Sequence, residues 1–271
     1  FLIIPCYTLC MNGMEININC DLGEKSELHS IENDPELLKI VNSASIACGY
    51  HAGDEQTMDF TIKTSKKNGV SIGAHPSFKD TKNFGRKRIN LSEREITDLI
   101  VDQYNILQSI AERYNENVSH IKPHGALNNM ACEDMDLANI IAKTIKNINK
   151  DLIYLVPTGS KMETAAKKLN MKIACEIFAD RNYEDDGNLV LRSKKDALIT
   201  NPEHAKAHVL EMVENQALNC LSGKKIPCEI DSVCIHGDSV SSLNTASVIR
   251  KNLMDNKLIL KPLNKMKKFN S

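Results

Sequence analysis

Residues 15–24, EININCDLGE, join a short apolar run to a cluster of polar side chains. The run EININC reads as a strand, and the overlapping motif NCDLGE carries two carboxylates, Asp21 and Glu24. The segment DPELLKIVN, residues 34–42, follows with the spacing of a helix. A strand, a polar motif at its end and then a helix form the unit of a parallel sheet with crossover helices, so this stretch predicts an α/β protein.

The same unit recurs along the chain. Six further apolar runs lie at 43–48, 69–74, 118–122, 152–156, 172–178 and 232–236, which gives seven predicted strands. Further helix-like segments lie at 54–69, 91–115, 134–147, 159–170 and 201–218. Ser92 and Glu95 form a capping-box pattern, Asn201 precedes a proline as an N-cap, and Gly69 stands where a left-handed C-cap would end a helix.

The polar motifs indicate which α/β architecture these units build. Neither GxGxxG nor GxxxxGK[ST] occurs, so the chain lacks the glycine signatures of a Rossmann sheet and a P-loop. Polar residues instead follow every predicted strand, which favours a barrel with its site spread over the carboxyl rim. No linker or repeat divides the chain, so we expect a single (β/α) barrel domain over 14–271 and an N-terminal extension over 1–13.

Charge and cysteine content exclude several classes of function. The formal net charge of −1 provides no field to gather nucleic acid or an anionic membrane, so we expect a small-molecule ligand. The nine cysteines show no pair of CxxC units, which argues against a zinc ribbon and a disulfide framework. Buried cysteines in a reducing compartment are the simpler interpretation, and we expect a cytoplasmic protein. Residues 1–10 are apolar but too short to span a bilayer.

The candidate site residues lie at the ends of the predicted strands. Four of the eight histidines are there, together with several carboxylates and two cations. We expect a catalytic group made of Asp21, Glu24, His51, His75, His124 and His236. We expect substrate to be bound by Lys122, Asp180, Arg181 and Asp238. Imidazoles mixed with carboxylates and cations shift proton affinities toward neutral pH, as general acid–base catalysis or a divalent metal requires.

A metal site and two structural interpretations stay open at this point. Asp21, His75 and His124 offer one oxygen and two imidazoles from separate strands, and His51 could replace any of them. No HExxH motif identifies zinc. Any single histidine here could be structural, and Arg181 could pair with neighbouring carboxylates.

The ordered motifs NCDLGE, ASIACGYHAGD, GVSIGAHPSF, FGRKRINLS, HIKPHGAL, EIFADRNYEDDGNLVLRS and CIHGD resemble the LamB/YcsF family from about residue 14 to 250. The resemblance implies an irregular seven-stranded (β/α) barrel of the glycoside hydrolase and deacetylase type. It also implies that 5-oxo-L-proline, ATP and water yield L-glutamate, ADP and phosphate, with two partners, 5-oxoprolinase subunits B and C. The chain departs from the family pattern at Tyr50 and Asn128.

Two other functions fit the same residues. A metal-dependent hydrolase could cleave an acetylated sugar or another amide without ATP, using the Asp and His cluster. A non-catalytic subunit could instead present substrate to its partners. Because no P-loop is present, the sequence does not place the nucleotide on this chain.

Overall fold

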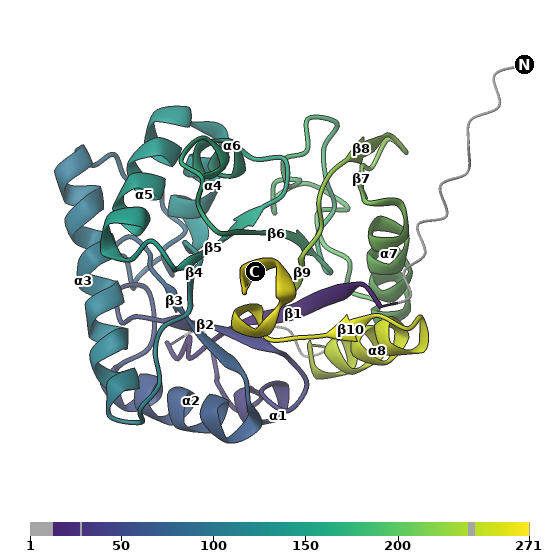
Figure 1. The fold of residues 1–271 in the computed structure, drawn as a ribbon. Helices are drawn as coiled ribbons and strands as arrows, with labels where there is room; N and C mark the ends of the chain where they lie inside the picture. Colours follow the sequence, from purple (N-terminus) through teal and green to yellow (C-terminus); the bar gives the residue numbers. More distant parts are fainter. Residues whose placement is uncertain (1–12, 28, 238–241, 271) are drawn as a thin grey trace, which may run out of the picture.

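The computed structural model describes residues 13–27, 29–237 and 242–270. Within them, seven parallel strands form a closed barrel, because β1 pairs with β2 on one side and with β9 on the other. In order around the barrel these strands are β1 (Glu15–Leu22), β2 (Ser43–Ala47), β3 (Ser71–His75), β4 (His120–Ile121), β5 (Ile153–Pro157), β6 (Ile173–Phe178) and β9 (Ser232–His236). The structure therefore confirms the predicted seven-stranded (β/α) barrel (Figure 1).

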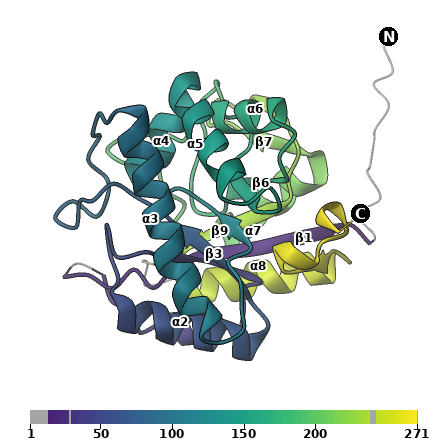
Figure 2. The same cartoon turned by 60° about the vertical axis from the view of Figure 1, so that its left-hand side comes forward.

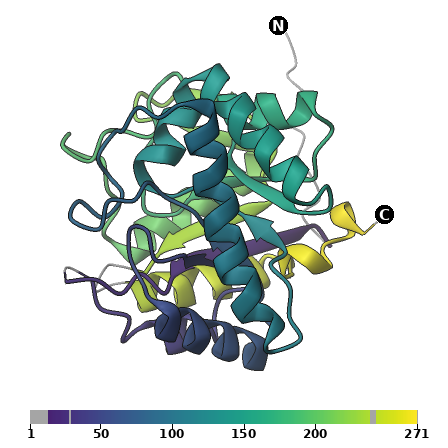
Figure 3. The same cartoon turned by 90° about the vertical axis from the view of Figure 1, so that its left-hand side faces the viewer.

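Helices surround the barrel and bury their apolar faces against it. They are α1 (Asp34–Leu37), α2 (Glu55–Asn68), α3 (Glu93–Glu112), α4 (Gly125–Glu133), α5 (Met135–Ile148), α6 (Lys161–Lys168), α7 (Pro202–Asn215) and α8 (Ser242–Asp255). The long helix α3 packs between α2 and α5 on the outside of the strands (Figures 2 and 3). An antiparallel hairpin of β7 (Ala217–Asn219) and β8 (Lys225–Pro227) lies apart from the barrel strands.

All seven predicted strands occur within two residues of their expected bounds. The predicted caps are confirmed: Ser92 and Glu95 form a capping box, Asn201 accepts from two backbone N–H groups, and Gly69 ends α2 with φ 68°. The helix predicted over 34–42 is wrong in length. It stops at Leu37, because the chain must extend to enter β2, where the Asn42 N–H donates to the Ile18 carbonyl.

The C-terminal segment, for which the sequence shows no motif, covers the amino-terminal end of the barrel (Figure 1). It contains β10 (Ile259–Leu260), which pairs with the start of β1, and the short 3₁₀ helices η1 (Leu263–Lys265) and η2 (Lys267–Phe269). Its apolar side chains form a small core with β5 and β6, made of Ile153, Leu155, Ala174, Leu263, Met266 and Phe269. The tail is thus part of the folded barrel.

Two further findings concern the cysteines and the helices. The cysteines between residues 20 and 234 are all free thiols, and most of them are buried, as expected. No helix among the described residues combines the length and apolarity needed to cross a membrane. Residues 1–12 of the expected extension lie outside the described residues.

Replacing Leu263 with Ala should destabilise the protein. The side chain is fully buried in the tail core, and truncating a buried leucine costs about 2–5 kcal/mol through lost burial and the cavity left behind. Equilibrium urea denaturation measures this change. Lys265→Ala, an exposed neighbour on the same 3₁₀ helix, is the control and should change stability by less than about 0.5 kcal/mol. Equal stability of the two variants would show that the tail does not contribute to the core.

Candidate active site

A cavity of about 380 Å³ opens at the carboxyl rim of the barrel and is lined by most of the predicted site residues. Asp21 lies on β1 and Glu24 just beyond it, while His75 ends β3. Lys122 and His124 follow β4, and His236 ends β9. Parallel strands place their carboxyl ends on one rim, so residues distant in sequence meet there.

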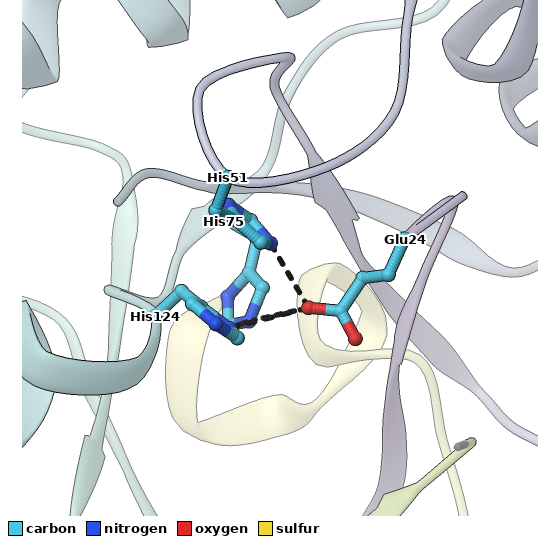
Figure 4. Close-up of side chains that lie close together, drawn as sticks. All are labelled: Glu24, His51, His75 and His124. Atoms are coloured by element: carbon cyan, nitrogen blue, oxygen red, sulfur yellow. Dashed lines mark hydrogen bonds and ion pairs between the residues drawn. The ribbon is translucent and has the colours of Figure 1, made fainter. Parts of the chain in front are cut away.

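Four side chains converge beside this cavity: Glu24, His51, His75 and His124 (Figure 4). Their potential ligand atoms all lie within 4.8 Å of one another. Glu24 Oε1 lies 3.0 Å from His51 Nε2, 3.2 Å from His124 Nδ1 and 3.8 Å from His75 Nε2. One carboxylate and three imidazoles arranged in this way are a set that can hold a divalent metal ion.

Backbone carbonyls fix the proton positions on two of these rings. His75 Nδ1 donates to the Lys122 carbonyl at 2.7 Å, and His124 Nε2 donates to the Phe84 carbonyl at 2.9 Å. A carbonyl only accepts, so each neutral ring has its lone pair on the other nitrogen. Those two nitrogens, His75 Nε2 and His124 Nδ1, lie 2.9 Å apart. Two facing lone pairs beside a carboxylate favour a bound cation between them.

For two of these imidazoles, burial favours the neutral form that binds metals. Burial lowers the pKa of His51 to about 3, and it also lowers the pKa of His124. The His51 and His124 rings stack with their centroids 3.9 Å apart, an arrangement that two imidazolium ions would disfavour. No described residue bonds to His51 Nδ1, which is buried.

The loop between β3 and α3 supports the histidine cluster. Phe84 has φ 54°, an uncommon value for a residue with a side chain, and its carbonyl holds His124. Its ring contacts His51 and His124 edge to face. Gly85 follows, where an added Cβ would lie 2.1 Å from Ser77 Oγ and 3.0 Å from both His51 and His124. Only glycine leaves room for the rings at this turn.

Lys122 occupies the centre of a second group of charges inside the barrel. Its ammonium donates to Asp21 Oδ1 at 2.9 Å, lies 3.2 Å from Glu176 Oε2 and donates to Asn19 Oδ1 at 3.3 Å. Burial opposes ionisation of both Lys122 and Asp21. His75 and the Lys122 ammonium nevertheless hold the pKa of Asp21 well below its usual range, and Asp21 and Glu176 help raise the pKa of Lys122.

A chain of hydrogen bonds continues this group down to the C-terminal tail. Asn19 Nδ2 donates to Ser232 Oγ at 2.8 Å, and Ser232 Oγ donates to Asn17 Oδ1 at 2.8 Å. Asn17 Nδ2 in turn donates to Ser43 Oγ at 2.8 Å, and Ser43 Oγ accepts the Leu263 N–H at 3.2 Å. One line of mutually hydrogen-bonded polar side chains therefore runs inside the barrel from the rim to the C-terminal tail.

His236 and Asp180 form a pair at the edge of the cavity. The His236 Nδ1 group lies 2.8 Å from Asp180 Oδ1, and the ring stacks on Phe178. Burial disfavours the imidazolium, but Asp180 outweighs it and raises the pKa of His236 above its ordinary value. The Asp180 pair therefore favours the imidazolium form of His236, which can donate a proton into the cavity.

The remaining predicted residues occupy several different places. Arg181 lines the cavity and donates to the Val190 and Ala197 carbonyls, instead of forming the ion pairs considered from the sequence. Asp238 lies outside the described residues. Lys122 is buried with its ammonium fully engaged, and its role toward substrate stays a prediction.

The structure also differs from the sequence predictions in two respects. The predicted metal triad combined Asp21 with His75 and His124, whereas the compact cluster contains Glu24 and His51 in place of Asp21. Asp21 Oδ2 lies 3.4 Å from His75 Nε2, at the side of this cluster. Sequence reasoning missed Glu176 and Asn19 altogether. A lone glutamate inside the apolar strand KIACEIF was the available signal for Glu176.

Comparison with known proteins identifies the class. The chain belongs to the LamB/YcsF family, whose model matches residues 16–268. A relative from Clostridium beijerinckii, the A subunit of 5-oxoprolinase, is 40% identical over 252 residues, covering 93% of this chain and 99% of the relative. The crystal structure of a lactam utilization protein from Thermus thermophilus superposes with TM-score 0.85 and 31% identity, covering 92% of this chain and 99% of that one.

A more distant structure shows the breadth of the fold. The peptidoglycan deacetylase PdaC of Bacillus subtilis superposes with TM-score 0.52 and 13% identity, covering 96% of this chain and 93% of that one. This likeness shows a shared barrel fold, as expected for the deacetylase type, and by itself implies no common reaction.

Replacing Lys122 with Met should destabilise the protein strongly. It leaves Asp21 and Glu176 buried without their cation, and breaking a buried ion pair costs about 3–5 kcal/mol. Urea denaturation measures the loss. Adding Glu176→Gln should recover part of it, because one uncompensated carboxylate is then removed. Lys63→Met, at an exposed position of α2, is the control and should leave stability nearly unchanged. A mild effect of Lys122→Met would contradict the central role of this ammonium.

Proposed function

We propose that this chain is the lactam-opening subunit of a 5-oxoprolinase, which converts 5-oxo-L-proline to L-glutamate. The observation that carries the proposal is one cavity where a metal-ligand cluster, the carboxylate of Asp21 and the Asp180-paired imidazole of His236 meet. Such a set suits attack of water on an amide carbonyl. The 5-oxoprolinase and lactam utilization proteins to which the chain is similar support the choice of a cyclic amide.

A divalent metal is part of the proposal. Glu24, His51, His75 and His124 would hold it, and the facing lone pairs of His75 and His124 are the structural reason to expect it. The nitrogen-rich ligand set suits zinc among first-row ions. When bound, the ion supplies Lewis-acid polarisation of the lactam carbonyl.

The chain's own residues complete the reaction. Water adds to the ring carbonyl carbon, and Asp21, which Lys122 keeps ionised, accepts a proton from it. The carbon–nitrogen bond of the ring then breaks, and His236 gives its proton to the departing nitrogen, which becomes the amine of glutamate. Asp180 positions the His236 ring for this transfer.

A lactam is a resonance-stabilised amide and is hydrolysed slowly without activation. The proposal therefore includes ATP and partner subunits. We propose that ATP transfers its γ-phosphoryl group to the lactam oxygen and leaves as ADP, and that phosphate is released after water has added to the ring carbon. Subunits B and C of the enzyme would take part in this phosphoryl transfer, since the chain has no P-loop. The relatives are named as one lettered subunit of their enzyme, which supports partners of this kind. The free cysteines fit a reducing compartment, and we propose the cytoplasm.

The second candidate is a metal-dependent amide or carbohydrate hydrolase that works without ATP. The possible metal-ligand cluster of Glu24, His51, His75 and His124 favours it, because a bound metal ion could activate water without ATP. Ring opening that proceeds at full rate without ATP and partner subunits would select this alternative.

Metal binding can be measured directly. The chelator-stripped chain should bind about one zinc ion at the cluster of Glu24, His51, His75 and His124, and His51 and His124 should release few protons, because burial already favours their neutral forms. Glu24→Gln should weaken zinc by more than about tenfold, since even indirect ligand contacts contribute that much. Metal analysis and calorimetric titration provide the readouts, with His204→Gln on the exposed face of α7 as the control. Unchanged zinc affinity in Glu24→Gln would rule out this ligand set.

Catalysis by His236 can be tested in the complex reconstituted with subunits B and C. His236→Asn should lower glutamate formation by about 10²–10⁴-fold, the usual contribution of a general acid. The wild-type rate should fall as pH rises through the raised pKa of His236, because the imidazolium is then lost, and this limb should be absent in the variant. His204→Asn is the matched control. Retention of the wild-type rate and pH profile by His236→Asn would remove this residue from the mechanism.

A further inference from the structure

Asn128 is a buried carboxamide on the wall of the cavity. The residue lies near the start of α4, lines the same cavity as Asp21 and His236, and exposes only 7% of its surface. Its side-chain oxygen Oδ1 is buried, and no described residue hydrogen-bonds to it. Buried polar atoms are nearly always paired, so an unpaired oxygen in the wall of a cavity requires an explanation.

Two cationic donors that line the same cavity are bound to carboxylates. Lys122 donates to Asp21 at 2.9 Å, and Arg88 donates to Glu133 at 2.7 Å. Neither of these donors therefore satisfies the Asn128 oxygen. A buried acceptor without a partner destabilises the fold, and an apolar side chain of the same size would avoid this cost. A donor that enters the cavity from outside the chain would satisfy the oxygen.

Two hydrogen bonds fix the start of α4 beside the histidine cluster. His124 Nε2 donates to the Phe84 carbonyl at 2.9 Å, and the Ala126 N–H donates to the Gly85 carbonyl at 2.9 Å. The Asn128 N–H donates to the His124 carbonyl at 3.3 Å, which places Asn128 one turn after His124. Residues four apart on a helix lie on one face, with their Cβ atoms about 5–6 Å apart. A ligand held at the histidine cluster therefore lies beside the Asn128 side chain.

The chemistry of the unpaired atom limits what the ligand presents to it. A carboxamide oxygen only accepts, so its partner must be a donor. In a lactam, the ring nitrogen carries a hydrogen and is bonded directly to the carbonyl carbon that water attacks. In a lactone of the same size, an ester oxygen without a hydrogen takes that place. A site built to hydrogen-bond an N–H rejects the analogue that lacks it, because the buried acceptor is then left unpaired.

We infer that Asn128 accepts a hydrogen bond from the ring N–H of the lactam and thereby selects cyclic amides over cyclic esters. The side-chain amide turns about χ2, a torsion with a broad energy minimum, so that Oδ1 faces the ligand. This hydrogen bond does not use the lone pair of the ring nitrogen, which stays available for the proton that His236 supplies. The inference rests on the proposed function for its choice of ring, whereas an acceptor for an N–H group on this wall does not depend on it.

Calorimetric titration of the full chain with 5-oxo-L-proline and with its lactone analogue, in which an ester oxygen replaces the ring N–H, tests this role. The wild-type chain should bind the lactam more than about tenfold more tightly than the lactone. Asn128→Leu should weaken lactam binding by more than about tenfold and change lactone binding by less than about threefold. Asn128→Asp keeps an acceptor oxygen and should keep the preference for the lactam, although its charge weakens both acidic ligands. Asn147→Leu, the same change at an exposed position of α5, is the matched control.

The outcomes separate this inference from the proposed function. Equal affinity of the wild-type chain for the two rings, no binding of either ring, or an unchanged preference in Asn128→Leu would overturn the role of Asn128. A parallel loss of both ligands in Asn128→Leu would overturn it as well, because the residue would then support the cavity without reading the N–H. Ring opening is assayed separately in the complex reconstituted with subunits B and C. An Asn128-dependent preference in a chain whose complex opens no lactam would retain the N–H subsite and refute the proposed function.

Discussion

The ammonium of Lys122, buried between Asp21 and Glu176, is the interaction on which the rest of the site depends. A closed barrel of short strands has a narrow interior, and here the part nearest the rim contains charged side chains. Those charges are tolerable only because a cation and two carboxylates compensate one another. The same contact keeps Asp21 ionised at the rim, so the stability of the barrel and the chemistry of the cavity share one ion-pair network.

The histidines at the rim around this ion-pair network differ in the protonation state that their surroundings favour. Burial favours the neutral form of His51 and His124, which can act as ligands, whereas Asp180 favours the protonated form of His236, which can act as an acid. Both states occur within one cavity because each ring has its own partner. Carbonyl acceptors orient His75 and His124, while a carboxylate orients His236.

The strands and the rim were predictable because apolar runs and strand-end polar motifs are local features of the sequence. The sequence did not predict that Glu24, and not Asp21, is the carboxylate of the histidine cluster. This arrangement depends on the turn at Gly23, whose φ of 70° and whose N–H bond to Asp34 Oδ2 at 2.8 Å direct Glu24 inward. Glu176 was not predicted as a site residue, because the sequence pattern of a strand does not show which of its side chains will contact a lysine from a distant part of the chain. The tail core was missed because short 3₁₀ helices have no periodicity to recognise.

The polar chain from Lys122 through Asn19, Ser232 and Asn17 to Ser43 has an evolutionary consequence. Each member satisfies its neighbour, so an apolar substitution at one position leaves the next with an unpaired donor or acceptor. Such changes are acceptable only when neighbouring positions change together. During evolution, substitutions at these positions inside the barrel should therefore occur in coupled groups. Substitutions on the outer helices should occur one residue at a time.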